Sequence, residues 1–189
     1  MSEPSGMSGR LLDAMARSAA RRYGSERVSE LAHALQCAEL AQGAGADDPE
    51  LTLACLLHDV GRFAVDQSLV FDRVGGARAG ARGHHELGAE LIAPFVPERV
   101  AWLVRMHADA KRYLCTTEPG YHQTLSPGSQ HTLTLQGGLM SPEEVARHAR
   151  HPWLADALRL RRWDDLAKVV GKATQPLEAW APLLRTYFG

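Results

Sequence analysis

The stretch LLHDVGRF, Leu56–Phe63, sets a histidine and an aspartate side by side at the end of an apolar run. Polar and charged groups lose free energy when they leave water without a partner, so His58 and Asp59 predict a partner that compensates for their burial. A metal ion is one candidate. Adjacent residues on a helix point about 100° apart, so both side chains can reach one ion only if the helix ends there, and Gly61 predicts such an end.

Outside this stretch, apolar residues recur with a helical period along nearly the whole chain, and no run of period-two alternation lies between hairpin turns. The sequence therefore predicts an all-α fold, and 189 residues suit one domain. We expect a flexible leader at 1–9 and a single domain over 10–189. The expected helices cover 10–23, 28–42, 49–58, 84–93, 97–111, 153–168 and 176–187.

Local signals refine this pattern at three places. Ser141-Pro142-Glu143-Glu144 has the form of an N-cap, a first-turn proline and a capping-box glutamate, so another helix is expected to begin there. The segment 118–129 interrupts the helical pattern. The high glycine content of segment 73–83 predicts a loop. We expect a flexible lid or connection rather than a phosphate-binding loop, because the segment matches neither of the usual phosphate-binding glycine spacings.

The composition bounds the possible partners. The chain has 21 Lys and Arg against 22 Asp and Glu, without a long basic run, so we expect no nucleic-acid and no membrane partner. The first ten residues lack the apolar core of a signal peptide. Cys37, Cys55 and Cys115 are odd in number and widely spaced, which favours reduced thiols. These features predict a cytoplasmic protein with a small-molecule substrate.

Eight of the nine histidines fall into two groups of four, and the ninth, His85, adjoins His84. Four of them lie among turn residues or on polar helix faces, where a solvated ring is expected: His122, His131, His148 and His151. The other four lie at or beside apolar helical segments: His33, His58, His84 and His107. One buried histidine alone is more often a hydrogen-bonded core residue, but four of them with Asp59 predict a site for iron, manganese or zinc inside a helical bundle.

These residues also resemble a known family. The order His33, His58-Asp59 and a distal aspartate is similar to the HD-domain superfamily, all-α metal proteins that are mostly phosphohydrolases. The segment HHELGAELI resembles its H-x-x-x-G-A element and selects His84 over His85. The segments YGSERVSELAHALQCAELAQ, HADAKRYL, LTLQGG and LRLRRWDD narrow the resemblance to the mixed-valent diiron oxygenases that cleave 1-hydroxy-2-aminoethylphosphonates.

The resemblance spans residues 23–165 and implies a single HD-domain helical bundle with a central dinuclear iron site, Fe(II)/Fe(III). It implies that one ion is bound by His33, His58, Asp59 and Asp164, and the other by Asp59, His84 and His107. Asp59 would then bridge the ions, and a shared carboxylate both neutralises charge and fixes their spacing. Asp165 stays open as a rival to Asp164.

The resemblance also implies roles around the metals. Tyr23 would occupy an iron before substrate arrives, and Glu26 would face the amino end of the substrate; alternatively, Tyr23 is a wall residue and Glu26 an acid near a helix N-terminus. The phosphonate would be bound by Lys111, Ser129, Gln136 and Arg161. Arg62, also a candidate for substrate binding, stands where the enzyme for the primary amine has a histidine, so a trimethylated substrate stays open.

The leading functional expectation is an O2-dependent oxygenase of organophosphonate catabolism. It would cleave the C–P bond of a 1-hydroxy-2-(amino or trimethylammonio)ethylphosphonate and yield phosphate with glycine or glycine betaine. One alternative is a metal-dependent phosphohydrolase of phosphate esters or nucleotides, in which two metals activate water. The other is a sensor that binds phosphonate without turnover. The sequence leaves the oligomeric state open.

Overall fold

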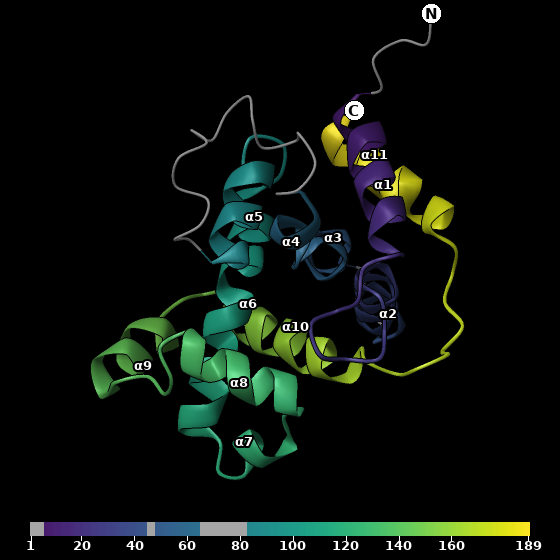
Figure 1. Cartoon of the computed structure of the whole chain (residues 1–189). Coiled ribbons are helices and arrows are strands. Elements are labelled where there is room, and N and C mark those ends of the chain that lie inside the picture. Colours follow the sequence, from purple (N-terminus) through teal and green to yellow (C-terminus); the bar gives the residue numbers. More distant parts are fainter. Residues whose placement is uncertain (1–5, 45–47, 65–82) are drawn as a thin grey trace, which may run out of the picture.

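The computed structural model describes residues 6–44, 48–64 and 83–189. In these ranges every regular element is a helix, apart from an isolated bridge between Arg22 and Ser29. The expected loop at 73–83 lies, except for Gly83, outside the described residues. The all-α prediction is confirmed, and Figure 1 shows the helices gathered in one bundle. The division into a leader and a domain stays a prediction, although the first helix already includes residues 7–9.

Four helices form the centre of the bundle: α2 (Glu30–Gly43), α3 (Pro49–Leu57), α6 (Glu98–Thr117) and α10 (Leu154–Leu166). Their facing sides bury leucines completely, among them Leu51, Leu56, Leu103 and Leu160. Each such side chain contributes about 1.5–3 kcal/mol when it leaves water. Side-chain caps fix where two of these helices begin, because Ser29 accepts the Ala32 N–H and Asp48 accepts the Leu51 N–H.

Two glycines bring α4 (Val60–Ala64) and α5 (His84–Ile92) into backbone contact. A Cβ atom on Gly61 would lie 2.0 Å from the carbonyl oxygen of His84, and one on Gly88 would lie 2.9 Å from the Gly61 nitrogen. The prediction that Gly61 ends the helix is therefore wrong. The preceding helix, α3, ends at Leu57, and Gly61 lies inside α4, where the absence of a side chain admits α5.

The remaining helices cover the two ends of the bundle (Figure 1). At one end lie α7 (Tyr121–Thr124), α8 (Pro127–Leu135) and α9 (Pro142–Ala149). The capping box at Ser141 and Glu144 is present, as predicted. At the other end, α1 (Met7–Ser18) packs against η2 (Leu177–Trp180) and α11 (Ala181–Phe188).

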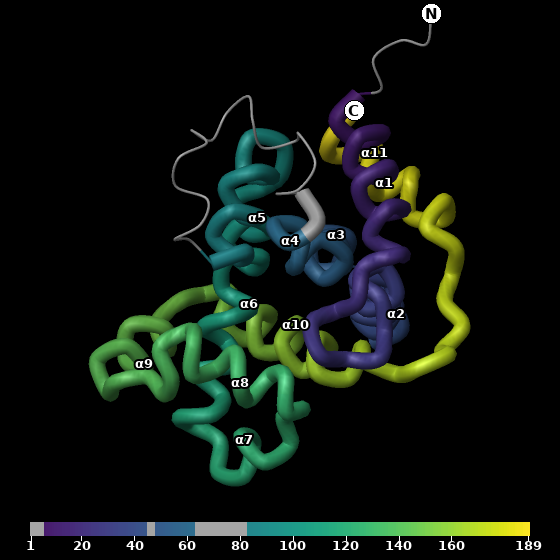
Figure 2. The backbone as a smooth tube through the Cα atoms, in the orientation of Figure 1, coloured from purple at the N-terminus to yellow at the C-terminus, as the bar shows by residue number. Residues whose placement is uncertain are grey.

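The sequence predicted a first helix that ends at Tyr23, but α1 ends at Ser18. Tyr23 instead lies in the segment between α1 and α2. Figure 2 shows this segment running past the end of α10. Tyr23 in this segment lies against His33 of α2. No helix in the described part of the chain is long and apolar enough to cross a membrane.

Candidate metal and substrate site

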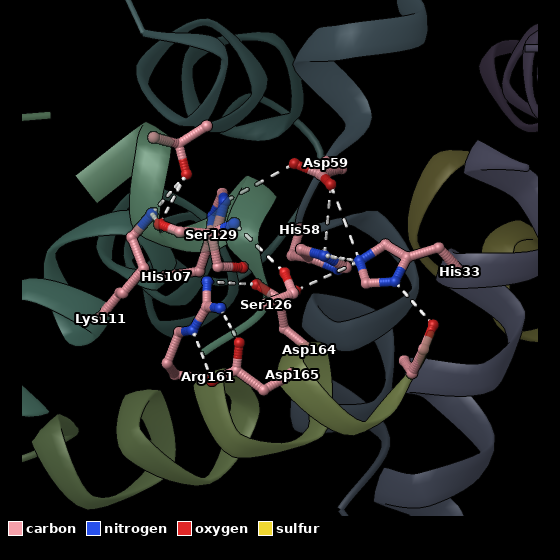
Figure 3. A network of polar contacts seen from close by, with 12 residues as sticks. His33, His58, Asp59, His107, Lys111, Ser126, Ser129, Arg161, Asp164 and Asp165 are labelled. Carbon is pink, nitrogen blue, oxygen red and sulfur yellow. Dashed lines mark hydrogen bonds and ion pairs between the residues drawn. The ribbon is translucent and has the colours of Figure 1, made fainter. Parts of the chain in front are cut away.

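Two groups of side chains that could hold metal ions lie at the centre of the bundle, and Figure 3 labels all of their members except His84. The first joins His33 from α2, His58 from the end of α3 and Asp164 from α10. The second joins Asp59, His84 from α5 and His107 from α6. Within each group the candidate ligand atoms lie within 4.8 Å of one another. The structure thus brings together all six residues that the sequence singled out.

Asp59 lies between the two groups. Its Oδ2 atom is 3.5 Å from Nε2 of His58 and 3.9 Å from Nε2 of His33. Its Oδ1 atom is 2.9 Å from Nε2 of His84 and 3.6 Å from Nε2 of His107. One carboxylate oxygen therefore faces each group, which is the arrangement a bridging ligand requires.

Three of the histidine rings have a defined orientation. Nδ1 of His33 lies 2.8 Å from the Ala167 carbonyl oxygen, that of His58 lies 2.8 Å from the Cys55 oxygen, and that of His107 lies 2.7 Å from the Val104 oxygen. A carbonyl only accepts, so each Nδ1–H donates and a neutral ring presents a lone pair at Nε2. Burial also lowers the pKa of His107 well below its usual range.

The Nε2 atoms of His33 and His58 are 3.0 Å apart. If both rings are neutral, the two lone pairs repel each other at this distance, and a proton or a metal ion bound by both nitrogens relieves the repulsion. Such backbone-oriented imidazoles are typical of metal ligands.

Buried carboxylate oxygens point to the same conclusion. Both oxygens of Asp59 and the Oδ1 atom of Asp164 are buried and accept no hydrogen bond. Burial alone would raise the pKa of Asp164, but the positive charges of Arg161 and Lys168 hold it well below its usual range. A buried, ionised oxygen that accepts no hydrogen bond is costly in this environment. The residues present fit metal ions with a preference for nitrogen and oxygen ligands.

Asp164 and Asp165 are adjacent on α10, and both accept hydrogen bonds from Arg161. Asp164 also lies 3.3 Å from Nε2 of His33. Asp165 faces away from the histidines and accepts the hydroxyl proton of Tyr121. The structure therefore places Asp164, and not its rival, beside the histidines.

A cavity of about 200 Å³ opens beside both groups. His84, His107 and Asp164 form part of its wall on the metal side. Every residue that the sequence proposed for catalysis or substrate binding also lines it: Tyr23, Glu26, Arg62, Lys111, Ser129, Gln136 and Arg161.

One wall of this cavity is cationic. The Lys111 ammonium donates to the Ser129 carbonyl oxygen at 3.2 Å and to Oγ1 of Thr132 at 2.7 Å. Burial, together with the charge of Arg161, lowers the pKa of Lys111 to about 8. Arg161 donates to Asp164 at 2.7 Å and is itself buried. We name Lys111, Ser129 and Arg161 the anion wall.

A carboxylate lies elsewhere in the cavity lining. Glu26 accepts a hydrogen bond of 2.5 Å from the Ser126 hydroxyl. Gly128 allows this approach, because a Cβ atom there would lie 3.1 Å from Oε1 of Glu26 and 2.5 Å from Oγ of Ser25. The cavity therefore combines an anion wall with an anionic group contributed by another segment.

Tyr23 and Arg62 form an aromatic and cationic stack beside the first metal group. The Tyr23 ring stacks on the His33 ring with a centroid distance of 3.8 Å and an angle of 17° between their planes. The Arg62 guanidinium lies 5.1 Å from the centroid of the Tyr23 ring, and its Nε is 3.6 Å from Glu30. Desolvation raises the pKa of Tyr23, so this side chain is a neutral phenol.

The sequence prediction missed several polar residues of the site. His131 and Thr132 line the cavity, Ser126 contacts Glu26, and Lys168 donates to Oγ of Ser129 at 2.9 Å. One signal was present: Ser126-Pro127 repeats the N-cap and proline pattern of Ser141-Pro142, and it begins α8. The interruption expected over 118–129 therefore contains α7 and the beginning of α8.

Comparison with known proteins supports these observations. The HD-domain family model matches residues 27–146. The hydroxymethylphosphonate dioxygenase of Gimesia maris is 39% identical over 158 residues, which cover 84% of this chain and 77% of the relative. The [1-hydroxy-2-(trimethylamino)ethyl]phosphonate dioxygenase (glycine-betaine-forming) of Leisingera caerulea is 36% identical over 163 residues, covering 86% and 81%.

A third relative, the uncharacterized protein L432 of Acanthamoeba polyphaga mimivirus, is 31% identical over 166 residues, which cover 87% of this chain and 74% of that protein. The fold, the His-Asp groups and the family match together define an HD-domain metal protein. Within that family, the chain belongs to the phosphonate dioxygenases and is an O2-dependent oxygenase. These findings favour the oxygenase prediction over the phosphohydrolase alternative.

Proposed function

We propose that this protein uses O2 to break the C–P bond of a 1-hydroxyphosphonate with a cationic nitrogen on the next carbon. The products are phosphate and glycine from the amine, or glycine betaine from the trimethylammonio compound. One O2 per substrate balances either reaction. The observation that carries the proposal is a single cavity lined by candidate metal ligands, an anion wall and the Glu26 carboxylate.

We assign two iron ions to the two His-Asp groups, with Fe(II)/Fe(III) as the active form. His33, His58 and Asp164 would bind one ion, His84 and His107 the other, and Asp59 both. When bound, the ions supply the redox chemistry that O2 requires. The chain supplies the orientation of the ligands and of the substrate.

The substrate is oriented by charge at its two ends. The forked guanidinium of Arg161 and the point charge of Lys111 suit phosphonate oxygens, and Ser129 and Gln136 add polar contacts. Glu26 pairs with the cationic nitrogen, and Arg62 borders the same cavity. The Leisingera relative is named for a trimethylamino substrate, which has a cationic nitrogen, and the Gimesia relative for hydroxymethylphosphonate, which has none. Glu26 is therefore the residue that would favour a cationic substrate in this protein.

Phosphate release tests this function directly. The protein is loaded with iron, manganese or zinc and offered the amino, trimethylammonio and hydroxymethyl phosphonates with and without O2. We expect release only with iron and O2, faster with a cationic substrate, and an EPR signal of a mixed-valent iron pair. Release from phosphate esters without O2 would support a phosphohydrolase, and binding without release would support a sensor.

Glu26→Gln is expected to lower kcat/KM for the cationic substrates about 10- to 100-fold, because hydrogen bonds to charged groups contribute about 1.5–3 kcal/mol. Hydroxymethylphosphonate, which has no nitrogen, serves as the internal control and should be turned over at the parental rate. Equal losses on all three substrates would show that Glu26 supports the cavity rather than the nitrogen.

Tyr23→Phe is expected to consume O2 faster in the absence of substrate, with unchanged metal content. The reason is that Phe retains the ring stacked on His33 but removes the hydroxyl proposed to protect the site until substrate binds. An oxygen electrode and metal analysis compare the variant with its parent. Identical background consumption would return Tyr23 to the role of a wall residue.

The pH dependence should report Lys111. Its pKa is lowered to about 8 by burial, so the anion wall carries this charge below pH 8 and loses it above. We expect kcat/KM, which reflects groups of the free enzyme, to fall as the pH rises through about 8. Lys111→Arg keeps its charge throughout this range and should abolish that fall; a fall that persists in the variant would assign it to another group.

A further inference from the structure

Asp165 lies beside Arg161 of the anion wall (Figure 3) and contacts three residues: Arg161, Tyr121 and Lys168. Its carboxylate accepts hydrogen bonds from Nε of Arg161 at 3.2 Å and from a terminal nitrogen of the same guanidinium. It also accepts the hydroxyl proton of Tyr121 and lies 3.5 Å from the Lys168 ammonium. Most of its side chain is buried.

The first consequence concerns Arg161. A guanidinium has five N–H groups in a fixed plane. Two of them bind Asp165 and one binds Asp164, which leaves two for a ligand. Because Asp164 and Asp165 hold the Arg161 guanidinium in place before a ligand arrives, binding an anion costs little side-chain entropy.

The second consequence concerns Ser129. Lys168 donates to Oγ of Ser129 at 2.9 Å. An ammonium group has no acceptor, so the serine oxygen must accept this bond and its own proton remains available to another acceptor. Lys168 therefore leaves the Ser129 hydroxyl free to donate a hydrogen bond, and a phosphonate oxygen requires a donor.

We propose that Asp165 is a positioning residue for the anion wall: it holds Arg161 directly and Ser129 through Lys168, so that their N–H and O–H groups face the phosphonate. This inference rests on the proposed function only in placing the phosphonate at the anion wall. Asp165 acts through its neighbours and binds neither substrate nor metal.

The test measures the binding of inorganic phosphate by calorimetry on the iron-loaded protein, next to KM, kcat, metal content and the melting temperature. Asp165→Asn keeps the size of the side chain but removes its charge, so the phosphate Kd and the KM for phosphonate should rise about 10- to 100-fold. The kcat should stay within about threefold, with metal content unchanged. Asp165→Glu should recover part of the affinity.

Two further variants sharpen the test. Lys168→Met should raise the phosphate Kd about fivefold, and combining it with Asp165→Asn should add less than the two separate effects, because the residues act through one contact. Asp109→Asn is the matched control, since Asp109 pairs with Arg112 at 2.9 Å and does not line the cavity. It should bind phosphate like the parent.

Parental phosphate binding in Asp165→Asn would overturn the proposal, and so would loss of metal or a lower melting temperature without a change in Kd or KM. Failure of the proposed function is distinguishable, because phosphate binding is measured without turnover. A protein that binds phosphate through Asp165 but releases none from phosphonates with O2 would keep this inference and refute the oxygenase. If Lys111→Ala also leaves the phosphate Kd unchanged, the phosphonate does not bind at the anion wall, and the proposed role of Asp165 is refuted together with that assignment.

Discussion

Asp59→Ala is expected to lose both metal ions and to reduce phosphate release below detection. Asp59 directs one oxygen to each His-Asp group, at 3.5 Å from His58 and 2.9 Å from His84. Removing it takes a ligand from both ions and the negative charge from between two cations, whose repulsion is strong at a separation of about 3.5–4 Å. No other single substitution affects both groups in this way.

Metal analysis of the purified variant measures this effect. His33→Ala and His107→Ala should each weaken metal binding mainly at one group. They therefore show the metal content expected when only one ion is affected. Asp109→Ala, a more exposed carboxylate on α6, is the matched control and should bind metal like the parent. Retention of one ion at full occupancy in Asp59→Ala would show that Asp59 serves a single group.

Gly61→Ala is expected to destabilise the fold and to disturb the metal group of Asp59, His84 and His107. The new methyl group would lie 2.0 Å from the His84 carbonyl oxygen and 2.8 Å from the Gly88 nitrogen. Both atoms are backbone, so α4 and α5 must separate rather than a side chain rotate. Overpacking costs about 1–3 kcal/mol and occasionally more, which lowers the Tm of a domain of this size by about 2–4 °C per kcal/mol.

Thermal unfolding and metal analysis test this prediction together. Gly43→Ala, at the end of α2, is the control, because a Cβ atom there has no neighbour within 4 Å. Its Tm and metal content should match those of the parent. A Gly61→Ala protein with parental Tm and metal content would mean that the two helices can shift without cost.

The sequence predicted the all-α bundle and a metal site of Asp59 with four histidines, because helical periodicity and the placement of histidines beside apolar runs are local properties. Asp164 came only from the resemblance to the HD-domain family. Three features depended on tertiary contacts instead. Adjacent aspartates on a helix look equivalent in sequence, and only the packing of α10 directs Asp164 to His33 and Asp165 to Arg161. Gly61 resembled a helix end because a glycine needed for close packing leaves the same sequence signal.

Tyr23 shows the same limit. The sequence predicted a helix that reaches Tyr23, but α1 ends at Ser18. The stacking of Tyr23 on His33 arises from the path of the segment between α1 and α2. The short helix α4 was also missed, since five residues carry too little periodicity to be recognised.

The hydrogen bonds of His58 and His107 to carbonyls three residues earlier bear on how the protein acquires its metal. Each ring is tethered to the turn of helix from which it projects, at Cys55 and Val104. Such a tether forms with the helix itself and requires no ion. Small metal-dependent domains gather their ligands only when the ion binds. We therefore expect the apolar interior to hold His58 and His107 in place before a metal ion binds, so that the metal-free protein stays folded.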